Sequence, residues 1–513
     1  MRTANVLFMR NRRHIMENLH LPQIFQSGMT LQRRAPVCIW GRAQSEARVT
    51  IRLAGNTVHT VASEGAFSAY LPPMEAGSGL TLTVSTDKET ITIDDVALGE
   101  VWLAGGQSNM EYLLRDDAEV AGEMQVNLPE VRCYEVPKVV YPGQENDRDY
   151  SAVGVWRRAR GEEAKYFTAV GYYFAKKLHA ELNVPIGIIN LTWGGTSASA
   201  YMREDYLTGA LKPYLDRAAE AQAKLDPVSE LERYRKLQKH LDDLHFDNSV
   251  SNLAPMQPDP SMMAFMAEMG ELFLSRYSPF RPCGLYETML KPTSPYTISG
   301  VIWYQGESDA AYADTYELLM QRMIACWRTL WKAELPFLIV QLASFEEMME
   351  RLDFVPIRAA QERLTKSCGK VWLACAMDAG MRYDIHPKHK RPIGERLALQ
   401  ALSKVYGRAI LADSPALEGA KREGDTLVLH FAHAGEGLAL RGETPETLEL
   451  IVDGVEQNAF SASVDGNELR ITSPEIADAK TVTLAFCQHP FCIDNICNCA
   501  GLPMLPFVYT WNA

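Results

Sequence analysis

Hydrophobic positions at the two ends of the chain follow the pattern of β structure. Between residues 20 and 98 the apolar runs are short, rich in β-branched residues, and separated by turn residues such as Gly77-Ser78-Gly79. That spacing predicts a small N-terminal β-sandwich. From about residue 409 a similar pattern returns, which predicts a C-terminal β domain. Its clearest apolar runs are residues 426–431, 448–452 and 481–486.

The middle of the chain has the longer, fully apolar runs of buried strands, with amphipathic stretches between them. The expected strands are residues 101–104, 184–191, 299–304, 337–342 and 370–376. The expected helices, in which apolar residues recur about every four positions, are residues 164–182, 313–331, 357–365 and 392–406. Strands that alternate with helices predict an α/β domain around a parallel sheet. Residues 110–160 are predicted to be rich in loops.

A charged segment interrupts this α/β pattern. Residues 203–245 are rich in Ala, Leu, Lys and Glu, with expected breaks at Pro213 and Pro227, and residues 246–282 are rich in Met and Pro. We interpret residues 203–282 as a helical insertion. The expected organisation is therefore a disordered leader at residues 1–19, a β-sandwich at 20–98, an α/β domain at 99–408 and a β domain at 409–513.

Length and charge narrow the possible partners. A chain of 513 residues exceeds one hydrophobic core, so two or three domains are expected. A formal net charge of −13 argues against nucleic acid and against an anionic membrane surface. No apolar run is long enough to cross a membrane, and no signal-peptide core precedes Arg10, so we expect a cytoplasmic protein. The sequence leaves the oligomeric state open.

The ten cysteines include one cluster near the C-terminus. Its members lack the paired C-x2-C spacing of zinc modules, so we expect free thiols and no metal. The cluster comprises Cys487, Cys492, Cys497 and Cys499.

Candidate chemistry begins where the first buried strand ends. The strand stops at Gly105-Gly106 and is followed by Gln107, Ser108 and Asn109. A serine at a sharp strand-to-helix turn can present its hydroxyl at the edge of a sheet, with backbone N–H groups beside it. The alternative is an ordinary turn in which Ser108 only caps a helix.

Three further strand ends carry polar groups or glycines. They are Gly194-Gly195, Gln305 and the turn Asp384-Ile385-His386. Ligands of open parallel sheets bind at the carboxyl ends of the strands, so these groups are expected to meet Ser108. A serine hydroxyl needs a base to accept its proton, and His386 is the candidate. Asp384 is the first candidate for the acid that orients His386, and Asp378 is the second.

An oxyanion formed by attack of Ser108 needs hydrogen-bond donors. The candidates are the backbone N–H groups of Ser108 and Gly195 and the side-chain amide of Gln305. Candidate substrate-binding residues flank them: Gln107, Asn109, Trp193 and Glu307. Glu307 has an alternative structural role as a hydrogen-bond acceptor, and Tyr304 is expected in the core. The remaining basic residues of this region, Lys388, His389 and Lys390, are expected to form a solvated turn.

Several segments together resemble the sialate O-acetylesterases, which are carbohydrate esterases of the SGNH type. The segments are GQSNM at 106–110, WGGTSASAY at 193–201, WYQGESDA at 303–310 and DIHPKHKRPIGERLA at 384–398, with flanking similarity at 21–41 and 500–510. The resemblance implies a flavodoxin-like, three-layer hydrolase domain with Ser108 as nucleophile and His386 as base. It also implies that Gln305 replaces the asparagine that SGNH enzymes usually place in the oxyanion hole.

The chain departs from the SGNH pattern at the acid. In that pattern the Asp commonly lies three residues before the His, whereas Asp384 lies two residues before His386. The stretch 495–499, NICNC, also lacks the tyrosine expected before Gly501-Leu502-Pro503. The identity of the triad acid is therefore left between Asp384 and Asp378.

The leading functional hypothesis is a serine esterase that needs no cofactor and removes O-acetyl groups from sugars, with O-acetylated sialic acid as substrate. Two alternatives are an acetyl esterase that acts on plant polysaccharides such as xylan or mannan, and a catalytically silent carbohydrate-binding protein. The Ser108 and His386 pair favours an enzyme, because a pure binding protein has no need of it.

Overall fold

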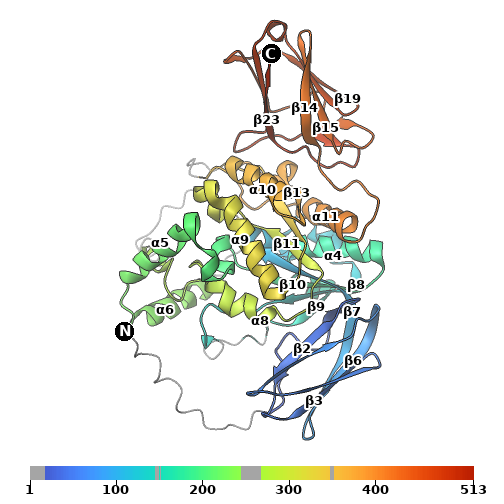
Figure 1. The fold of residues 1–513 in the computed structure, drawn as a ribbon, viewed down its shortest axis with the longest axis vertical. Coiled ribbons are helices and arrows are strands. Elements are labelled where there is room, and N and C mark those ends of the chain that lie inside the picture. Colours follow the sequence, from blue (N-terminus) through green and yellow to red (C-terminus); the bar gives the residue numbers. More distant parts are fainter. Residues whose placement is uncertain (1–17, 145–149, 151, 244–266, 347–351) are drawn as a thin grey trace.

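The computed structural model describes residues 18–513 except 145–149, 151, 244–266 and 347–351. The molecule is elongated (Figure 1), with N-terminal β structure at one end, a mixed α/β region in the middle and C-terminal β structure at the other end. The predicted leader at 1–19 lies almost wholly outside the described residues.

A mostly parallel sheet forms the middle of the molecule. Its main path has the strand order β13-β12-β11-β7-β10-β8-β9, and along this path only β8 and β9 pair in antiparallel orientation. This confirms the prediction of a mixed α/β fold around a largely parallel sheet. The strands are β7 (Thr90–Gly106), β8 (Asn127–Glu135), β9 (Trp156–Arg160), β10 (Ile186–Thr192), β11 (Gly300–Tyr304), β12 (Phe337–Gln341) and β13 (Val371–Cys375).

The central strand β7 is the point where the strand order reverses. Its neighbours are β10 on one side and β11 on the other, so the chain leaves β7 and returns on both sides of it. Leu191 of β10 and Trp303 of β11 both lie opposite Gly105. The carboxyl ends of these three strands therefore meet at one edge of the sheet, which is where ligands of open α/β sheets bind.

Two pairs of helices cover the sheet, one on either side of it (Figure 1). Helix α4 (Ala169–Leu182) packs on α11 (Arg391–Gln400), and α9 (Ala313–Trp331) packs on α10 (Val355–Ser367). Helix α4 starts five residues later than predicted because the Thr168 side chain caps it by accepting from the Gly171 N–H. Within the described residues no helix is long and apolar enough to cross a membrane.

The N-terminal strands join the central sheet through β7. Strand β7 pairs with β1 (Thr30–Gln32) and β6 (Gly77–Ser85), and β6 continues to β3 (Arg48–Leu53) and β4 (Asn56–Val61). Strand β2 (Val37–Arg42) pairs separately with β5 (Ala66–Leu71). The boundary predicted between residues 98 and 99 therefore falls inside a single strand of 17 residues.

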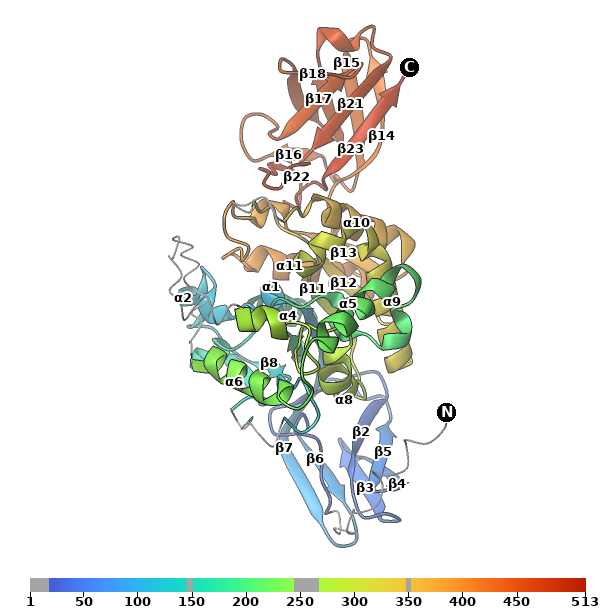
Figure 2. The ribbon, with the colours of Figure 1, turned by 90° about the vertical axis from the view of Figure 1, so that its left-hand side faces the viewer.

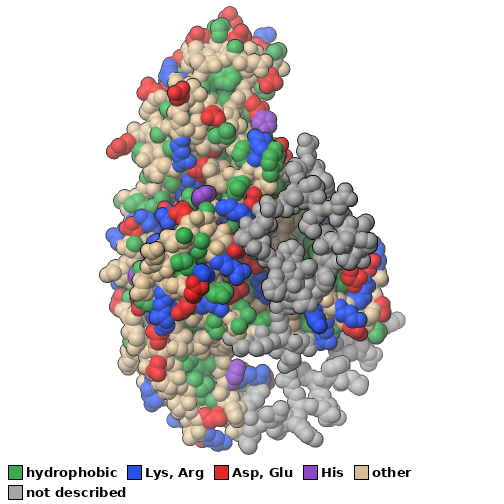
Figure 3. Space-filling view, turned by 180° about the vertical axis from the view of Figure 1, so that it is seen from behind, with side chains coloured by type: hydrophobic (Ala, Val, Ile, Leu, Met, Phe, Trp, Pro, Cys, Tyr) green, Lys and Arg blue, Asp and Glu red, His purple; other side chains and the backbone are tan. Residues whose placement is uncertain are grey.

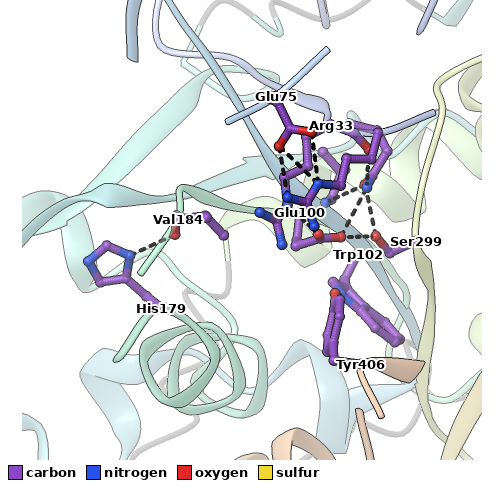
Figure 4. Close-up of polar contacts among 11 residues, drawn as sticks. Arg33, Glu75, Glu100, Trp102, His179, Val184, Ser299 and Tyr406 are labelled. Atoms are coloured by element: carbon purple, nitrogen blue, oxygen red, sulfur yellow. Dashed lines mark hydrogen bonds and ion pairs between the residues drawn. The ribbon is translucent and has the colours of Figure 1, made fainter. Parts of the chain in front are cut away.

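A polar cluster holds the middle of β7 in place (Figure 4). The Glu100 carboxylate accepts from Arg33 Nε at 2.6 Å and Gln32 Nε2 at 3.0 Å, and Ser299 also donates to it. Two residues on, Trp102 Nε1 donates to the Tyr406 hydroxyl at 2.9 Å. These bonds satisfy a buried carboxylate and fix the strand that leads to Ser108.

Residues 110–160, predicted to be rich in loops, contain two strands of the central sheet. Strands β8 and β9 extend the sheet beyond β10. Their burial patterns are mixed, and Arg132 of β8 is buried beside Asp95. A charged residue inside a strand hides the apolar pattern that marks a buried strand in sequence, which explains the missed elements.

The predicted helical insertion contains two long helices. They are α5 (Lys212–Ala223) and α6 (Glu230–Asp243), which lie in front of the central sheet in Figure 2. Pro213 lies in the first turn of α5 and does not break it, because proline is compatible with that position. Residues 244–266 of the insertion lie outside the described residues. The short helices of the middle region are α1 (Ser108–Glu111), α2 (Val120–Glu123), α3 (Gly161–Ala164) and α8 (Lys291–Thr293).

The C-terminal strands form two four-stranded sheets and one two-stranded ribbon. One sheet contains β14 (Ala416–Glu423), β15 (Thr426–Ala432), β19 (Ser461–Asp465) and β20 (Glu468–Thr472). The other contains β17 (Leu448–Val452), β18 (Val455–Gln457), β21 (Thr481–Phe486) and β23 (Phe507–Asn512), and β16 (Leu438–Leu440) pairs with β22 (Ile496–Asn498). Their core includes Cys375 and Met377 from the end of β13, so it is continuous with the middle region.

Candidate active site

Ser108 lies directly after the central strand, as the sequence predicts. Gly106 ends β7 with φ +132°, and a Cβ atom there would lie 2.1 Å from the Tyr304 carbonyl oxygen. Only glycine fits this close approach of β7 and β11. Ser108 then begins the short helix α1 and is partly exposed. The turn therefore presents the Ser108 side chain at the carboxyl edge of the sheet.

The glycines after β10 lie beside Ser108. The Gly194 N–H donates to Glu111 Oε2 at 2.6 Å, and a Cβ atom on Gly194 would lie 3.4 Å from the Ser108 Cβ. Gly195 follows with φ +74° and is exposed. Within the described residues its N–H makes no hydrogen bond. Gly195 therefore has a free backbone donor close to the serine.

The segment that carries His386 is bonded to the segment that carries Ser108. The Asn109 side-chain amide donates to the Ile385 carbonyl at 3.0 Å across 276 positions of sequence. The rings of Tyr112 and His386 lie 6.4 Å apart, centroid to centroid. The structure thus brings the predicted nucleophile and base into one region, although no hydrogen bond joins their side chains within the described residues. Catalytic hydrogen bonds are often long before substrate binds.

His386 is held in its neutral form. Burial and, to a smaller extent, the charge of Lys390 together lower the pKa of His386 to about 4, while Asp384 opposes both effects. Asp384 Oδ1 accepts from the backbone N–H of His386 at 2.9 Å, and Lys388 pairs with its other oxygen at 3.1 Å. A neutral imidazole at ordinary pH is the form that accepts a proton from a hydroxyl.

Asp378, the second candidate for the triad acid, pairs with two arginines. It forms a bidentate pair with Arg396, at 2.6 and 2.7 Å, and an ion pair with Arg441. These cations lower the pKa of Asp378 despite its burial. Its position between the middle region and the C-terminal strands favours a structural role.

Gln305 is placed differently from its predicted role. The side chain is fully buried, and its amide donates to Asp309 Oδ2 at 2.7 Å and to the Thr196 carbonyl at 3.3 Å. Both amide hydrogens are thus used within the protein. The prediction that Gln305 donates to an oxyanion is not supported by this arrangement. Its side chain instead holds Thr196, and so the adjacent Gly195, against Asp309.

Three of the four predicted substrate-binding residues are buried and bonded to protein. Gln107 Oε1 accepts from the Ser308 N–H at 3.2 Å, which ties the end of β7 to the end of β11. Asn109 donates to Glu307 Oε1 at 2.5 Å. These contacts favour roles for Gln107, Asn109 and Glu307 in positioning the site. They agree with the alternative prediction that Glu307 is a structural hydrogen-bond acceptor. Trp193 is only partly buried, with the Lys138 ammonium 5.3 Å from its ring centroid.

Lys390, predicted to be solvated, is buried. Its Nζ donates to Asn109 Oδ1 at 2.5 Å and lies 4.8 Å from the Tyr112 ring centroid and 5.5 Å from that of Tyr304. Burial lowers the pKa of Lys390 to about 7, and burial also raises the pKa of Glu307. The prediction failed because Lys390 lies in a charged run that gives no sign of burial. Tyr304 lies in the core, as predicted.

Asp309 and Glu111 are functional candidates that the sequence analysis missed. Asp309 is fully buried and accepts four hydrogen bonds, while Glu111 fixes Gly194. The available signal was their spacing, since each follows a strand-end residue by three or four positions within a helical turn.

The C-terminal cysteine cluster does not form a metal site in the described part of the chain. There, no group of three or more His, Cys, Asp or Glu side chains is placed to hold an ion. Cys487, Cys492 and Cys497 are buried free thiols, and Cys499 is exposed.

Comparison with known proteins identifies related chains. Residues 266–403 match the family described as "Carbohydrate esterase, sialic acid-specific acetylesterase". The sialate O-acetylesterase of Mus musculus is 25% identical over 419 residues, which cover 74% of this chain and 72% of that protein. The Homo sapiens sialate O-acetylesterase is 25% identical over 421 residues, which cover 74% of this chain and 69% of that protein.

Among solved structures, a carbohydrate acetylesterase from Xanthomonas citri is similar over almost the whole chain. It is 28% identical, with a TM-score of 0.75, and the match covers 96% of this chain and 99% of that chain. Together with the strand-end serine and glycines and the nearby histidine, these similarities support the sialate O-acetylesterase family of carbohydrate esterases for this chain.

Proposed function

We propose that the protein is a serine esterase that hydrolyses O-acetyl esters on sugars, with O-acetylated sialic acid as its substrate. Similarity to this family supports a carboxylic ester hydrolase. The observation that carries the assignment of residues is the Asn109–Ile385 hydrogen bond, because it holds the Ser108 turn against the His386 turn. The finer fold assignment, an SGNH-type hydrolase domain at about 99–408 between two β domains, is part of this proposal.

In the proposed reaction Ser108 attacks the acetyl carbon. As the bond from Oγ to this carbon forms, the hydroxyl proton passes to the neutral ring of His386. The bond between the acetyl carbon and the sugar oxygen then breaks, and His386 returns the proton to that oxygen. Water then attacks the acetyl carbon of the acetyl-serine and gives its proton to His386. The bond between this carbon and Oγ breaks, His386 returns the proton to Oγ, and acetate leaves. We assign Asp384 as the residue that orients His386.

The negative oxygen of each tetrahedral intermediate needs donors that are free before substrate binds. The proposed donors are the N–H groups of Ser108, at the start of α1, and of Gly195. Glu111 supports them, because its carboxylate fixes Gly194 next to Ser108. The Gln305 amide already donates to Asp309 and Thr196, so it is not one of the proposed donors.

The first test is Ser108→Ala. The variant is expected to lose at least about a thousandfold in acetate release from 9-O-acetylated sialic acid and from 4-nitrophenyl acetate, since no other nucleophile replaces the hydroxyl. Labelling of the wild-type protein by a fluorophosphonate, mapped to Ser108 by mass spectrometry, measures the same nucleophile without a sugar.

Matched controls keep this test specific. Ser463→Ala changes an exposed serine on β19 of the C-terminal strands, and it should keep most of the activity. Acetate release by Ser108→Ala at the wild-type rate would overturn the assignment. Faster release from acetylated xylan or mannan than from O-acetylated sialic acid would overturn the choice of substrate and leave the esterase in place.

A further inference from the structure

A cavity of about 230 Å³ adjoins the proposed oxyanion donor. Gly195 and Ser308 line the cavity near the catalytic turn, and Phe273, Phe280 and Tyr312 form much of its apolar wall. The rings of Phe273 and Phe280 stack with centroids 4.6 Å apart. The cavity is small for a ligand site, so it suits one end of a single sugar better than a polysaccharide chain.

Arg217, on α5 of the insertion, is the basic side chain that lines this cavity. Its guanidinium carbon lies 3.8 Å from the Tyr312 ring centroid and 5.2 Å from that of Tyr214. Stacking uses the faces of the guanidinium and leaves its edge N–H groups in the plane. One of them, Nε–H, donates to the Pro213 carbonyl at 3.2 Å.

The remaining edge of Arg217 has no acidic partner. Among the described residues, no carboxylate forms an ion pair with it. Arg203 shows the contrast, because it stacks on Tyr206 and also forms a bidentate pair with Asp205. The two terminal nitrogens of Arg217 are therefore held in a fixed plane and are free for a bidentate acceptor.

The one carboxyl group that lines the cavity does not compete for Arg217. Asp309 is fully buried and accepts from the hydroxyls of Ser197 and Tyr214, at 2.6 and 3.1 Å. It also accepts from the Ala198 N–H at 3.0 Å and the Gln305 amide at 2.7 Å. Tyr214 links the two groups, since it bonds Asp309 through its hydroxyl and contacts Arg217 through its ring.

We propose that Arg217 binds the carboxylate of an acidic sugar whose acetyl ester lies at Ser108 and Gly195. This inference rests on the proposed function and deepens it, because it names the residue that selects an acidic sugar over a neutral one. The aromatic walls contact the apolar faces of the same sugar, and the cavity lies between the ester site and Arg217.

The test compares acidic and neutral substrates in Arg217→Gln. For 9-O-acetylated sialic acid KM should rise about ten- to a hundredfold while kcat changes little, since the lost contact is equal in ground and transition states. The methyl ester of that substrate and 4-nitrophenyl acetate should be hydrolysed at wild-type rates. Arg217→Lys keeps the positive charge but loses the two parallel N–H donors of the guanidinium. Its KM for 9-O-acetylated sialic acid should lie between those of the wild type and Arg217→Gln. Arg203→Gln is the matched control and should leave KM unchanged.

A binding measurement separates this inference from the proposed function. By calorimetry the wild-type protein should bind N-acetylneuraminate at least about tenfold more tightly than its methyl ester, and Arg217→Gln should bind both equally. Acetate release from the sialate with an unchanged KM in Arg217→Gln would overturn the inference alone. No hydrolysis of the sialate, with Arg217-dependent binding of N-acetylneuraminate, would overturn the proposed function and keep the carboxylate site. Absence of such binding would overturn the site.

Discussion

At the scale of single residues, Asn109 connects the segments that form the candidate site. Its side chain receives a hydrogen bond from Lys390 and donates to Glu307 and Ile385, so two distant segments meet next to Ser108. The meeting of the Ser108 and His386 segments could be predicted from the sequence, because both follow strands of the same parallel sheet. The burial of Asn109 and Lys390 could not be predicted. Polar residues in a loop give the same sequence pattern whether they face water or pair with each other.

Removal of the Lys390 charge should move the acid limit of activity. His386 must be neutral to act as a base, so activity falls as pH falls through its pKa of about 4. The nearby positive charge of Lys390 lowers that pKa, and Lys390→Met should therefore raise it and shift the acid limb to higher pH by about one unit. The measurement is kcat/KM for acetate release between pH 3 and pH 8.

Lys366→Met is the control for this shift, because Lys366 is exposed on α10 and pairs only with Glu362. An acid limb that stays in place in Lys390→Met, with the variant folded, would show that the lysine does not act on His386.

Substitution of the two candidate acids should affect different properties, namely activity for Asp384 and stability for Asp378. Asp384→Asn should reduce kcat by about a hundredfold or more, because Asp384 contacts His386 and stabilises its charged form. Asp378→Asn should lower the temperature of unfolding, because it leaves two arginines without their carboxylate, while the folded protein keeps its activity. Kinetics paired with thermal unfolding test both; the reverse order would move the catalytic role to Asp378.

At the scale of elements, sequence patterns predicted the strands and helices that are uniformly buried or clearly amphipathic. Strands β10 to β13 and helices α9 and α10 lie within a few residues of their predicted positions. Strands β8 and β9 were missed because polar side chains, such as the buried Arg132, break their apolar runs. The length of β7 was missed because its first half pairs with N-terminal strands and its second half with strands of the central sheet. No local sequence pattern shows that the two halves form one strand.

The crossing of β7 and β11 gives a prediction at this scale. Gly106→Ala places a methyl group 2.1 Å from the Tyr304 carbonyl oxygen in a backbone conformation with positive φ. The strands must separate or twist, so the temperature of unfolding should fall by at least about 5 °C, with loss of activity. Gly122→Ala, where nothing lies within 4 Å of the new methyl group, should be nearly neutral by the same thermal measurement.

An unchanged unfolding temperature in Gly106→Ala would mean that the two strands can part without cost next to the turn that carries Ser108. Wild-type acetate release in the same variant would also contradict the rigid placement of Ser108 described above.

At the scale of the whole molecule, polar contacts link the three regions to one another. The N-terminal strands connect through β7 and Glu100, and the C-terminal strands connect through Asp378 and Arg358, which donates to the carbonyls of His489 and Pro490. Acidic and basic side chains are interspersed over the face shown in Figure 3.

Arg441→Ala tests the link to the C-terminal strands. Arg441 pairs with Asp378 and donates to the Gly501 carbonyl, and Asp378 keeps Arg396 when Arg441 is removed. The unfolding temperature should fall by about 2–4 °C with little change in kcat, as expected for a partly exposed pair. Arg470→Ala removes an arginine that pairs within the C-terminal sheet and is the control. A large loss of kcat in Arg441→Ala would instead connect the C-terminal region to catalysis.

Strand β7 also limits how this protein can be shortened or recombined. A cut at residue 98 or 99 would divide one strand and strip Glu100 of Arg33 and Gln32 while leaving its carboxylate in the interior. A chimeric protein in which another sequence replaces the first hundred residues would have to supply more than a new N-terminal layer. It would also have to supply a strand edge that pairs with the rest of β7. Any exchange of the N-terminal layer must therefore keep β7 and the turn that carries Ser108 together as one structural unit.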